Sequence, residues 1–233
     1  MQFLTRLPVP VKVRFTPETQ AWSVVFYPWI GLLIGGLLLS IREVLDDAGV
    51  MLTSAMLLTV WVWVTGGMHL DGLADSADAW IGGQGDRERS LKIMKDPCSG
   101  PIAVAVVVLM LLLKFSALTE LMGQRNLMPL LWTPVVGRSL ILLLMLTTPY
   151  IRPNGLGSPL VEKLPRLPVS LTALISLILA GVMLGPWPLL VAGLALGWLR
   201  FQMVSRLGGC TGDTLGATVE MGEAAVLVAC ALV

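Results

Sequence analysis

The feature that most constrains this chain is a series of apolar runs long enough to cross a lipid bilayer. A transmembrane helix needs about 20 predominantly apolar residues, and four runs of roughly that length fall in the first two thirds of the sequence. Two shorter runs follow, separated at 185–188 by Gly-Pro-Trp-Pro, because proline cannot continue a helix interior. A last run at the C-terminus is too short to span unless it takes residues from the polar segment before it. The runs are 24–41, 50–68, 102–121, 127–148, 171–184, 189–203 and 224–233.

Composition supports lipid as the solvent of this chain. Of the 233 residues, 55% are hydrophobic and 13% are charged, whereas a soluble domain has about 25% charged residues. We therefore predict an all-α polytopic integral membrane protein, with residues 1–233 forming a single membrane-embedded domain. The net charge of +1 gives no polybasic surface, so we predict no nucleic-acid partner. Cys98, Cys210 and Cys230 have no metal-ligand spacing, and we interpret them as packing residues.

The distribution of basic residues predicts how seven spans are oriented. Seven crossings would place the N-terminal segment and the segments 69–101, 149–170 and 200–223 on one side. These segments hold twelve basic residues, and the opposite side holds two, Arg42 and Arg125. Cytoplasmic loops are enriched in lysine and arginine, so we expect the N-terminus and these segments to lie in the cytoplasm. The twelve are Arg6, Lys12, Arg14, Arg87, Arg89, Lys92, Lys95, Arg152, Lys163, Arg166, Arg200 and Arg206.

An aspartate-rich segment at 69–78 is the first candidate site. If it is helical, Asp71, Asp75 and Asp78 lie at i, i+4 and i+7 and fall within about 60° of arc. Like charges at this spacing repel each other, and the cost rises beside a membrane. A hard divalent cation with oxygen ligands, such as Mg²⁺, would cancel the charge. We predict that these three aspartates hold Mg²⁺; a solvated helix face whose acids bind nothing is the alternative.

Two further groups near this segment are candidates for substrate contact. His69, the one histidine of the sequence, would point roughly opposite Asp71 on the same helix. It is either a capping or packing residue at the membrane boundary, or a hydrogen-bond donor or base toward a substrate group. Lys95 and Asp96 lie at the mouth of the third span. Phosphate charge could be held there, so we predict that both contact substrate.

A second acidic segment, rich in glycine, lies at 206–223. Its glycines would let backbone amides approach an anion closely, and Asp213 or Thr214 could cap a following helix whose N-terminus is a phosphate site. Asp213 and Glu220 are seven residues apart and so share a helix face. Both acidic segments fall on the same predicted side, so we expect Asp213 to reach the site of Asp71 and to join its metal ligands; an interhelical turn before a capped helix is the alternative. The predicted substrate-binding residues of this segment are Gly209, Thr211, Gly212, Thr214 and Glu220.

Arg138 lies in the middle of the fourth apolar run. An ionisable residue at this depth in a membrane is usually functional and pairs toward the bundle interior. We predict that Arg138 binds an acid of the site or a substrate phosphate, and a purely structural ion pair is the alternative.

Together these motifs resemble the cobalamin synthase family, whose enzyme is also called adenosylcobinamide-GDP ribazoletransferase or cobalamin-5′-phosphate synthase. The resemblance runs in order from residue 3 to the C-terminus. One departure follows Lys95 and Asp96, where the family often has an arginine and this chain has Pro97 and Cys98. The motifs that carry the resemblance are FLTRLPVP at 3–10, HLDGLADSAD at 69–78, DRER at 86–89, IMKD at 93–96 and LGGCTGDTLGA at 207–217.

The resemblance implies a multi-pass phosphotransferase of the cell inner membrane, with its active site facing the cytoplasm and Mg²⁺ as cofactor. A hydroxyl of α-ribazole, or of its 5′-phosphate, would attack the phosphorus attached to cobinamide in adenosylcobinamide-GDP, and GMP would leave. The resemblance carries the acidic metal site over to Asp71, Asp75 and Asp78, and the second motif to Asp213. One of the three aspartates or His69 could accept the proton of the attacking hydroxyl, and the sequence does not choose between them. Homo-oligomers are common among such enzymes, so we expect one here.

Two other functions remain open. One is another membrane phosphotransferase of the CDP-alcohol type, whose usual motif has an arginine after Asp-Gly-x-x-Ala and a different aspartate spacing. The other is a cation-coupled transporter, which should scatter its polar residues through the bilayer midplane. Here the polar residues lie mainly at helix ends on one side, with Arg138 as the exception.

Overall fold

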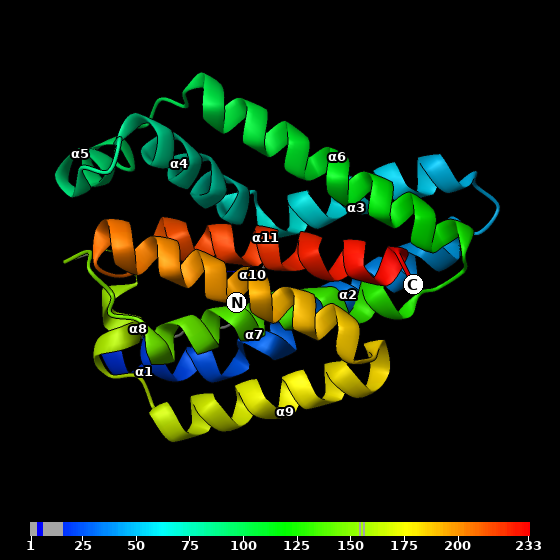
Figure 1. Ribbon diagram of the computed structural model, residues 1–233. Coiled ribbons are helices and arrows are strands. Elements are labelled where there is room, and N and C mark those ends of the chain that lie inside the picture. The colour runs from blue at the N-terminus through cyan, green and yellow to red at the C-terminus, as the bar shows by residue number, and fades with distance from the viewer. Residues whose placement is uncertain (1–3, 7–15, 154, 156) are drawn as a thin grey trace.

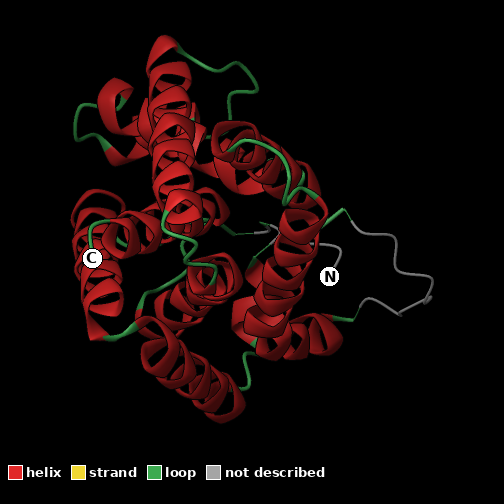
Figure 2. Cartoon of the chain, turned by 90° about the vertical axis from the view of Figure 1, so that its right-hand side faces the viewer, coloured by secondary structure: helices red, strands yellow, loops and turns green. Residues whose placement is uncertain are grey.

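The computed structural model is a bundle of helices (Figure 1) and describes residues 4–6, 16–153, 155 and 157–233. Every described element is a helix or a loop (Figure 2), and the described chain has one isolated β-bridge in place of strands. The prediction of an all-α protein is therefore confirmed. The elements are α1 Pro17–Ser23, the 3₁₀ turn η1 Val24–Phe26, α2 Tyr27–Val44, α3 Val50–Thr65, α4 Met68–Gly82, α5 Arg87–Ile93, α6 Pro101–Gly123, α7 Met128–Thr147, α8 Ser158–Glu162, α9 Arg166–Leu184, α10 Pro186–Leu207 and α11 Gly212–Ala231.

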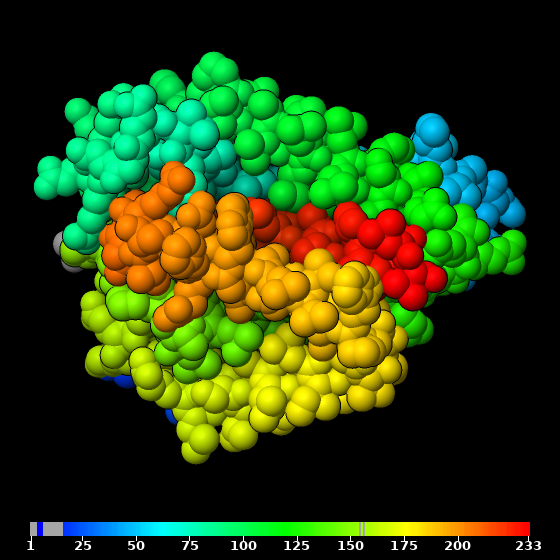
Figure 3. All heavy atoms as spheres, in the orientation of Figure 1, coloured from blue at the N-terminus to red at the C-terminus, as the bar shows by residue number. Residues whose placement is uncertain are grey.

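Six helical segments of the described chain are long and apolar enough to cross a membrane, and a seventh span results if α3 and α4 are counted as one bent segment. This confirms a polytopic membrane protein. The outer face is apolar, as lipid contact requires, and Figure 3 shows α9 and α10 covering much of one side. Exposed side chains on these two helices include Leu171, Leu174, Ile178, Val182, Leu190, Leu194, Trp198 and Phe201.

The last span begins well before the apolar run that predicted it. The run covers 224–233, but α11 begins at Gly212 and includes the acidic segment before the run. As a result Glu220 and Glu223 enter the bundle interior, where both side chains are buried. The helix can hold these acids among apolar neighbours because two buried cations from other helices, Lys114 and Arg138, pair with them.

The second predicted span, 50–68, is interrupted by two glycines. Gly66 and Gly67 have φ angles of 69° and 70°, a left-handed conformation that glycine adopts at little cost. The chain turns by 86° between α3 and α4. The aspartate-rich segment is therefore helical, as predicted, but it lies on its own helix at an angle to the apolar span.

The polar connections gather at one end of the bundle, which we call the motif end. Figure 1 places α5 and α8 at this end, together with the turn that precedes α11. The loops 45–49 and 124–127 and the C-terminus lie at the opposite end. The basic-residue pattern predicts the same division of these segments between the two ends. Lys12 and Arg14, which contribute to that pattern, lie outside the described residues.

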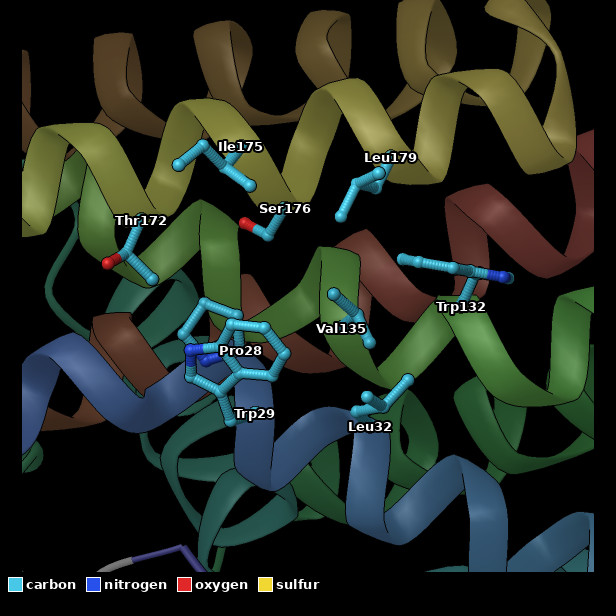
Figure 4. Close-up of a pocket in the computed structure, with 9 residues that line it drawn as sticks. All are labelled: Pro28, Trp29, Leu32, Trp132, Val135, Thr172, Ile175, Ser176 and Leu179. Atoms are coloured by element: carbon cyan, nitrogen blue, oxygen red, sulfur yellow. The ribbon is translucent and has the colours of Figure 1, made fainter.

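A small apolar groove on the lipid-facing flank lies between α2, α7 and α9 (Figure 4). It has a volume of about 80 Å³, and Trp29, Leu32, Val135 and Ile175 line it. Ser176, also on its wall, is hydrogen-bonded to Ser139 at 2.8 Å. None of the candidate acids lines this groove, so it is not the predicted site.

Cysteine labelling tests the orientation. In a Cys98→Ser background, which removes the exposed cysteine, Glu88→Cys and Asp47→Cys place exposed thiols at the motif end and the opposite end. A membrane-impermeant maleimide applied to intact spheroplasts should label Asp47→Cys and should reach Glu88→Cys only after permeabilisation, because the basic segments stay in the cytoplasm. Strong labelling of Glu88→Cys in intact spheroplasts would reverse the topology.

Candidate active site

The site begins where α4 and α11 cross in close contact. A Cβ atom at Gly72 would lie 2.6 Å from the backbone oxygen of Asp213, and one at Gly216 would lie 3.3 Å from the Cα atom of His69. Side chains at these positions would force the two helices apart, and glycine lets the backbones approach. The crossing therefore brings together two motifs that are far apart in sequence.

A cavity of about 500 Å³ opens beside this crossing. Asp71 and His69 of α4 and Asp213 of α11 line it, and the segment after α7 adds Tyr150 and Arg152. Asp213 therefore lines the same cavity as Asp71, as we expected, and their sharing of one metal ion stays a prediction. Apolar residues of α7 and the N-terminal segment also line the cavity: Ile141, Met145 and Leu4. The rest of the N-terminal motif, Phe3 and 7–10, lies outside the described residues.

Asp71 and Asp213, which line the cavity, interact electrostatically with a third carboxylate, that of Asp75. Asp71 is exposed, and Asp75 is partly buried one turn further along α4. Asp75 lies within electrostatic reach of Asp71, Asp213 and Arg152. Asp71 and Asp75 of the predicted stripe therefore interact electrostatically with Asp213, the predicted partner from α11.

Asp78, the third member of the stripe, faces the start of α6. Its Oδ1 atom accepts a hydrogen bond of 2.9 Å from the Ala103 backbone N–H, and its Oδ2 atom accepts one from the Gly100 N–H. Carboxylates stabilise helix N-termini in this way, because they satisfy free N–H groups and oppose the helix dipole. Asp78 does not line the cavity, so the geometry gives it a capping role and does not support the predicted metal contact.

The turn before α11 is fixed by a reciprocal cap. Thr211 is the N-cap: its hydroxyl accepts from the Thr214 N–H at 3.3 Å, and the Thr214 hydroxyl accepts from the Thr211 N–H at 2.9 Å. Of the two predicted caps, Thr214 takes part in the reciprocal cap, whereas Asp213 lines the cavity and accepts a hydrogen bond of 3.5 Å from the Thr211 hydroxyl. Both threonines are fully buried and their hydroxyls serve the cap, whereas Gly212 lines the cavity.

The segment 149–152 packs against this turn and was missed as a site element. Cys210 N–H donates to the Pro149 oxygen at 2.8 Å, and Ile151 N–H donates to the Cys210 oxygen at 3.0 Å. Gly209 is buried against Pro149, where a side chain would collide. This glycine serves close packing, so the structure gives no support to its predicted substrate contact.

Arg152 and Tyr150 come to the cavity from this segment. Arg152 Nη1 lies 2.7 Å from Asp213 Oδ2. Burial raises the pKa of the Tyr150 phenol, so the group keeps its proton near neutral pH. The sequence showed Arg152 only as one of many basic loop residues, and no motif spacing marked either residue.

Lys95 and Asp96 lie away from the cavity. Both are exposed in the turn after α5, and neither lines the cavity. Asp96 Oδ1 accepts a hydrogen bond of 3.0 Å from the Cys98 N–H, which stabilises the turn. Their predicted substrate contact stays a prediction.

Arg138 and Glu220 belong to a buried ionic network inside the bundle. Lys114 Nζ lies 2.6 Å from Glu220 Oε2 and 2.6 Å from Glu223 Oε2, and Arg138 Nη1 pairs with Glu223 Oε1. The Lys114 ammonium also lies 5.2 Å from the centre of the Trp61 ring. Two cations and two carboxylates balance, and none of the four lines the cavity. The structural ion pair, the alternative for Arg138, is the arrangement observed. The predicted substrate contacts of Arg138 and Glu220 gain no support from this geometry and stay predictions.

The cavity acids fit a hard cation through their chemistry. Oxygen is the ligand atom that Mg²⁺ prefers, and this ion commonly uses one or two carboxylates together with substrate phosphates and water. Asp71 and Asp213 supply two such carboxylates, and a positively charged group, the Arg152 guanidinium, already lies against Asp213. Within the described part of the chain, no three acidic, histidine or cysteine side chains converge closely enough to hold an ion by themselves.

Comparison with known proteins decides the family. The profile described as Cobalamin-5-phosphate synthase matches residues 1–231. The chain belongs to this family. Adenosylcobinamide-GDP ribazoletransferase of Pseudomonas aeruginosa (strain UCBPP-PA14) is 53% identical over 236 residues, covering 100% of this chain and 96% of that protein. The proteins of the same name from Pseudomonas syringae pv. syringae (strain B728a) and Pseudomonas putida (strain F1) are each 50% identical, covering 100% of this chain and 97% and 96% of their own lengths. No solved structure matches the chain.

The buried ionic network of Lys114, Arg138, Glu220 and Glu223 predicts that removing one of its charges destabilises the fold. Lys114→Met leaves two buried carboxylates with a single cation, which should destabilise the fold by about 3–5 kcal/mol. Thermal unfolding in detergent should show a markedly lower Tm. Adding Glu220→Gln restores charge balance and should recover part of the loss. The matched control is Lys163→Met, because Lys163 pairs with Glu18 at an exposed site and surface pairs contribute little. Equal Tm values for the Lys114 and Lys163 variants would contradict the account.

Proposed function

We propose that this chain transfers the cobinamide phosphate of adenosylcobinamide-GDP to α-ribazole or its 5′-phosphate and releases GMP. The observation that carries the proposal is the cavity at the crossing of α4 and α11. Asp71 and Asp213, from the two motifs that mark the family resemblance, line it together. Relatives that are about half identical over the whole chain carry the name of this enzyme.

The reaction exchanges one phosphorus–oxygen bond for another. The acceptor hydroxyl oxygen bonds to the phosphorus attached to cobinamide, while that phosphorus loses its bond to the bridging oxygen, which leaves with GMP. The hydroxyl proton passes to a base at the cavity. Asp71, Asp75 and His69 remain the candidates: Asp71 and His69 line the cavity, and Asp75 acts on it electrostatically.

The chain's own residues orient and neutralise the phosphates. Gly212 and Asp213, at the start of α11, line the cavity, and the N–H groups of a helix N-terminus can donate to phosphate oxygens. The protonated Tyr150 phenol can donate to another. Such positioning supplies much of the rate enhancement in phosphoryl transfer.

We propose that Asp71 and Asp213 hold Mg²⁺ together with substrate phosphates and water, and that Asp75 adds negative charge beside them. When bound there, the ion would neutralise diphosphate charge and stabilise the departing GMP. The placement of Asp71 and Asp213 on one cavity supports these two ligands, whereas Asp78 is engaged by the amides of α6.

We place the enzyme in the cell inner membrane with its cavity toward the cytoplasm. The support is the sequence pattern of twelve basic residues on the segments predicted to share one side, against two on the opposite side. The cavity lies at this same end, where charged nucleotides are available. A homo-oligomeric state stays a prediction.

Purified protein, both substrates and Mg²⁺ provide the test, with GMP release as the readout. Asp71→Ala and Asp75→Ala should each lower kcat by about 10²–10³-fold or more, because both remove charge that orients the reaction centre. Asp47→Ala, at an exposed position of the opposite end, is the matched control and should be fully active. The folded state of each variant is checked by its Tm. Normal turnover with retained Mg²⁺ dependence in either cavity variant would remove that residue from the site, and wild-type protein without GMP release would refute the proposed function.

A further inference from the structure

Among the described residues, Arg152 is the only lysine or arginine that lines the cavity. It reaches in from the segment after α7 and lies 2.7 Å from Asp213. The pair is only partly buried: the Arg152 side chain is 25% exposed and that of Asp213 is 19% exposed. Ion pairs that remain in contact with water contribute little to stability, so this one can be exchanged for another partner.

The backbone of Arg152 is anchored while its side chain is long enough to change partner. The hydrogen bonds of Ile151 and Pro149 with Cys210 join its segment to the turn before α11. These hydrogen bonds involve only the backbone of the segment, so they do not restrain the flexible side chain that carries the Arg152 guanidinium. A planar guanidinium binds phosphate oxygens through two parallel N–H groups, which makes arginine well suited to a diphosphate.

The proposed Mg²⁺ and the Arg152 guanidinium would both bind the Asp213 carboxylate. A carboxylate oxygen that accepts a charged hydrogen bond from Arg152 is a poorer ligand for a divalent ion, because both cations compete for the same negative charge. With a divalent ion bound at Asp213, the Arg152 guanidinium would be released at the wall of a cavity that would then contain phosphate.

We propose that Arg152 is a substrate-binding residue that exchanges partners: it pairs with Asp213 in the free protein and with the diphosphate of the donor substrate when a divalent cation occupies Asp213. The inference rests on the proposed function for the identity of the diphosphate. It assigns Arg152 two opposing effects, since the same side chain would weaken metal binding before substrate arrives and strengthen nucleotide binding afterwards.

Two titrations of purified protein in detergent measure these effects separately. Mn²⁺ binding without nucleotide is followed by electron paramagnetic resonance, and GDP binding at saturating Mn²⁺ is followed by calorimetry. Arg152→Gln should bind Mn²⁺ about 3–10-fold more tightly, because Asp213 is freed. The same variant should bind GDP about 10–100-fold more weakly, because charged hydrogen bonds to phosphate are lost.

Two further variants separate this exchange from a structural role. Arg152→Lys keeps the charge but not the paired N–H groups, so its Mn²⁺ affinity should stay near that of the wild type while its GDP affinity falls. Lys163→Gln removes a positive charge from an exposed position of the same inter-helix connection and should change neither affinity.

A purely structural arginine would lower both affinities together, and that result would overturn the proposal. Unchanged Mn²⁺ binding or unchanged GDP binding in Arg152→Gln would overturn it as well. Should Arg152→Gln fail to fold, Arg152→Lys decides the matter through its GDP affinity alone. If Arg152→Gln shows both opposing effects but the wild-type protein releases no GMP from adenosylcobinamide-GDP, the proposed function is refuted and the role of Arg152 stays intact.

Discussion

The buried ionic network of Lys114, Glu220, Glu223 and Arg138 is the constraint on which the other features of the bundle depend. A membrane interior offers no water to unpaired charges, so each of these side chains must find its partner inside the protein. The pairs join α6, α7 and α11, and they fix how α11 is rotated about its axis. Asp213 lies two turns before Glu220 on the same face, so this rotation also directs it toward the cavity.

A second constraint determines how closely the acidic motifs approach. Gly72 and Gly216 let α4 and α11 cross with their backbones nearly in contact, while Gly66 and Gly67 turn α4 away from the apolar span. The acids of α4 consequently lie beside the capped start of α11, at the end of the bundle that carries the basic loops. One substrate can then contact both the N-terminus of α11, which favours anions, and the carboxylates of α4.

The sequence predicted the spans, the helical acid stripe and the meeting of Asp71 with Asp213, because hydrophobic length, helical periodicity and charge alternation are local or additive signals. It did not predict the features that depend on tertiary contacts. Apolar character continues to Met68, so the bend at Gly66 was missed. Periodicity aligned Asp78 with its neighbours but could not show that the start of α6 binds it. The partners of Arg138 and Arg152 lie 85 and 61 positions away along the chain, and no spacing rule connects them.

The central claim is that Asp71 and Asp213 serve one site, and a double-mutant cycle on Mn²⁺ binding tests it most directly. Affinities are measured for the wild type, Asp71→Asn, Asp213→Asn and the double variant. If both carboxylates act on the same ion, each single change weakens binding and the double variant loses clearly less than the sum of the two losses, since removing either ligand already disrupts the shared site. Strictly additive losses, or a loss in only one of the two single variants, would mean that the motifs do not share a metal, and the account of a single site at the crossing of α4 and α11 would be wrong.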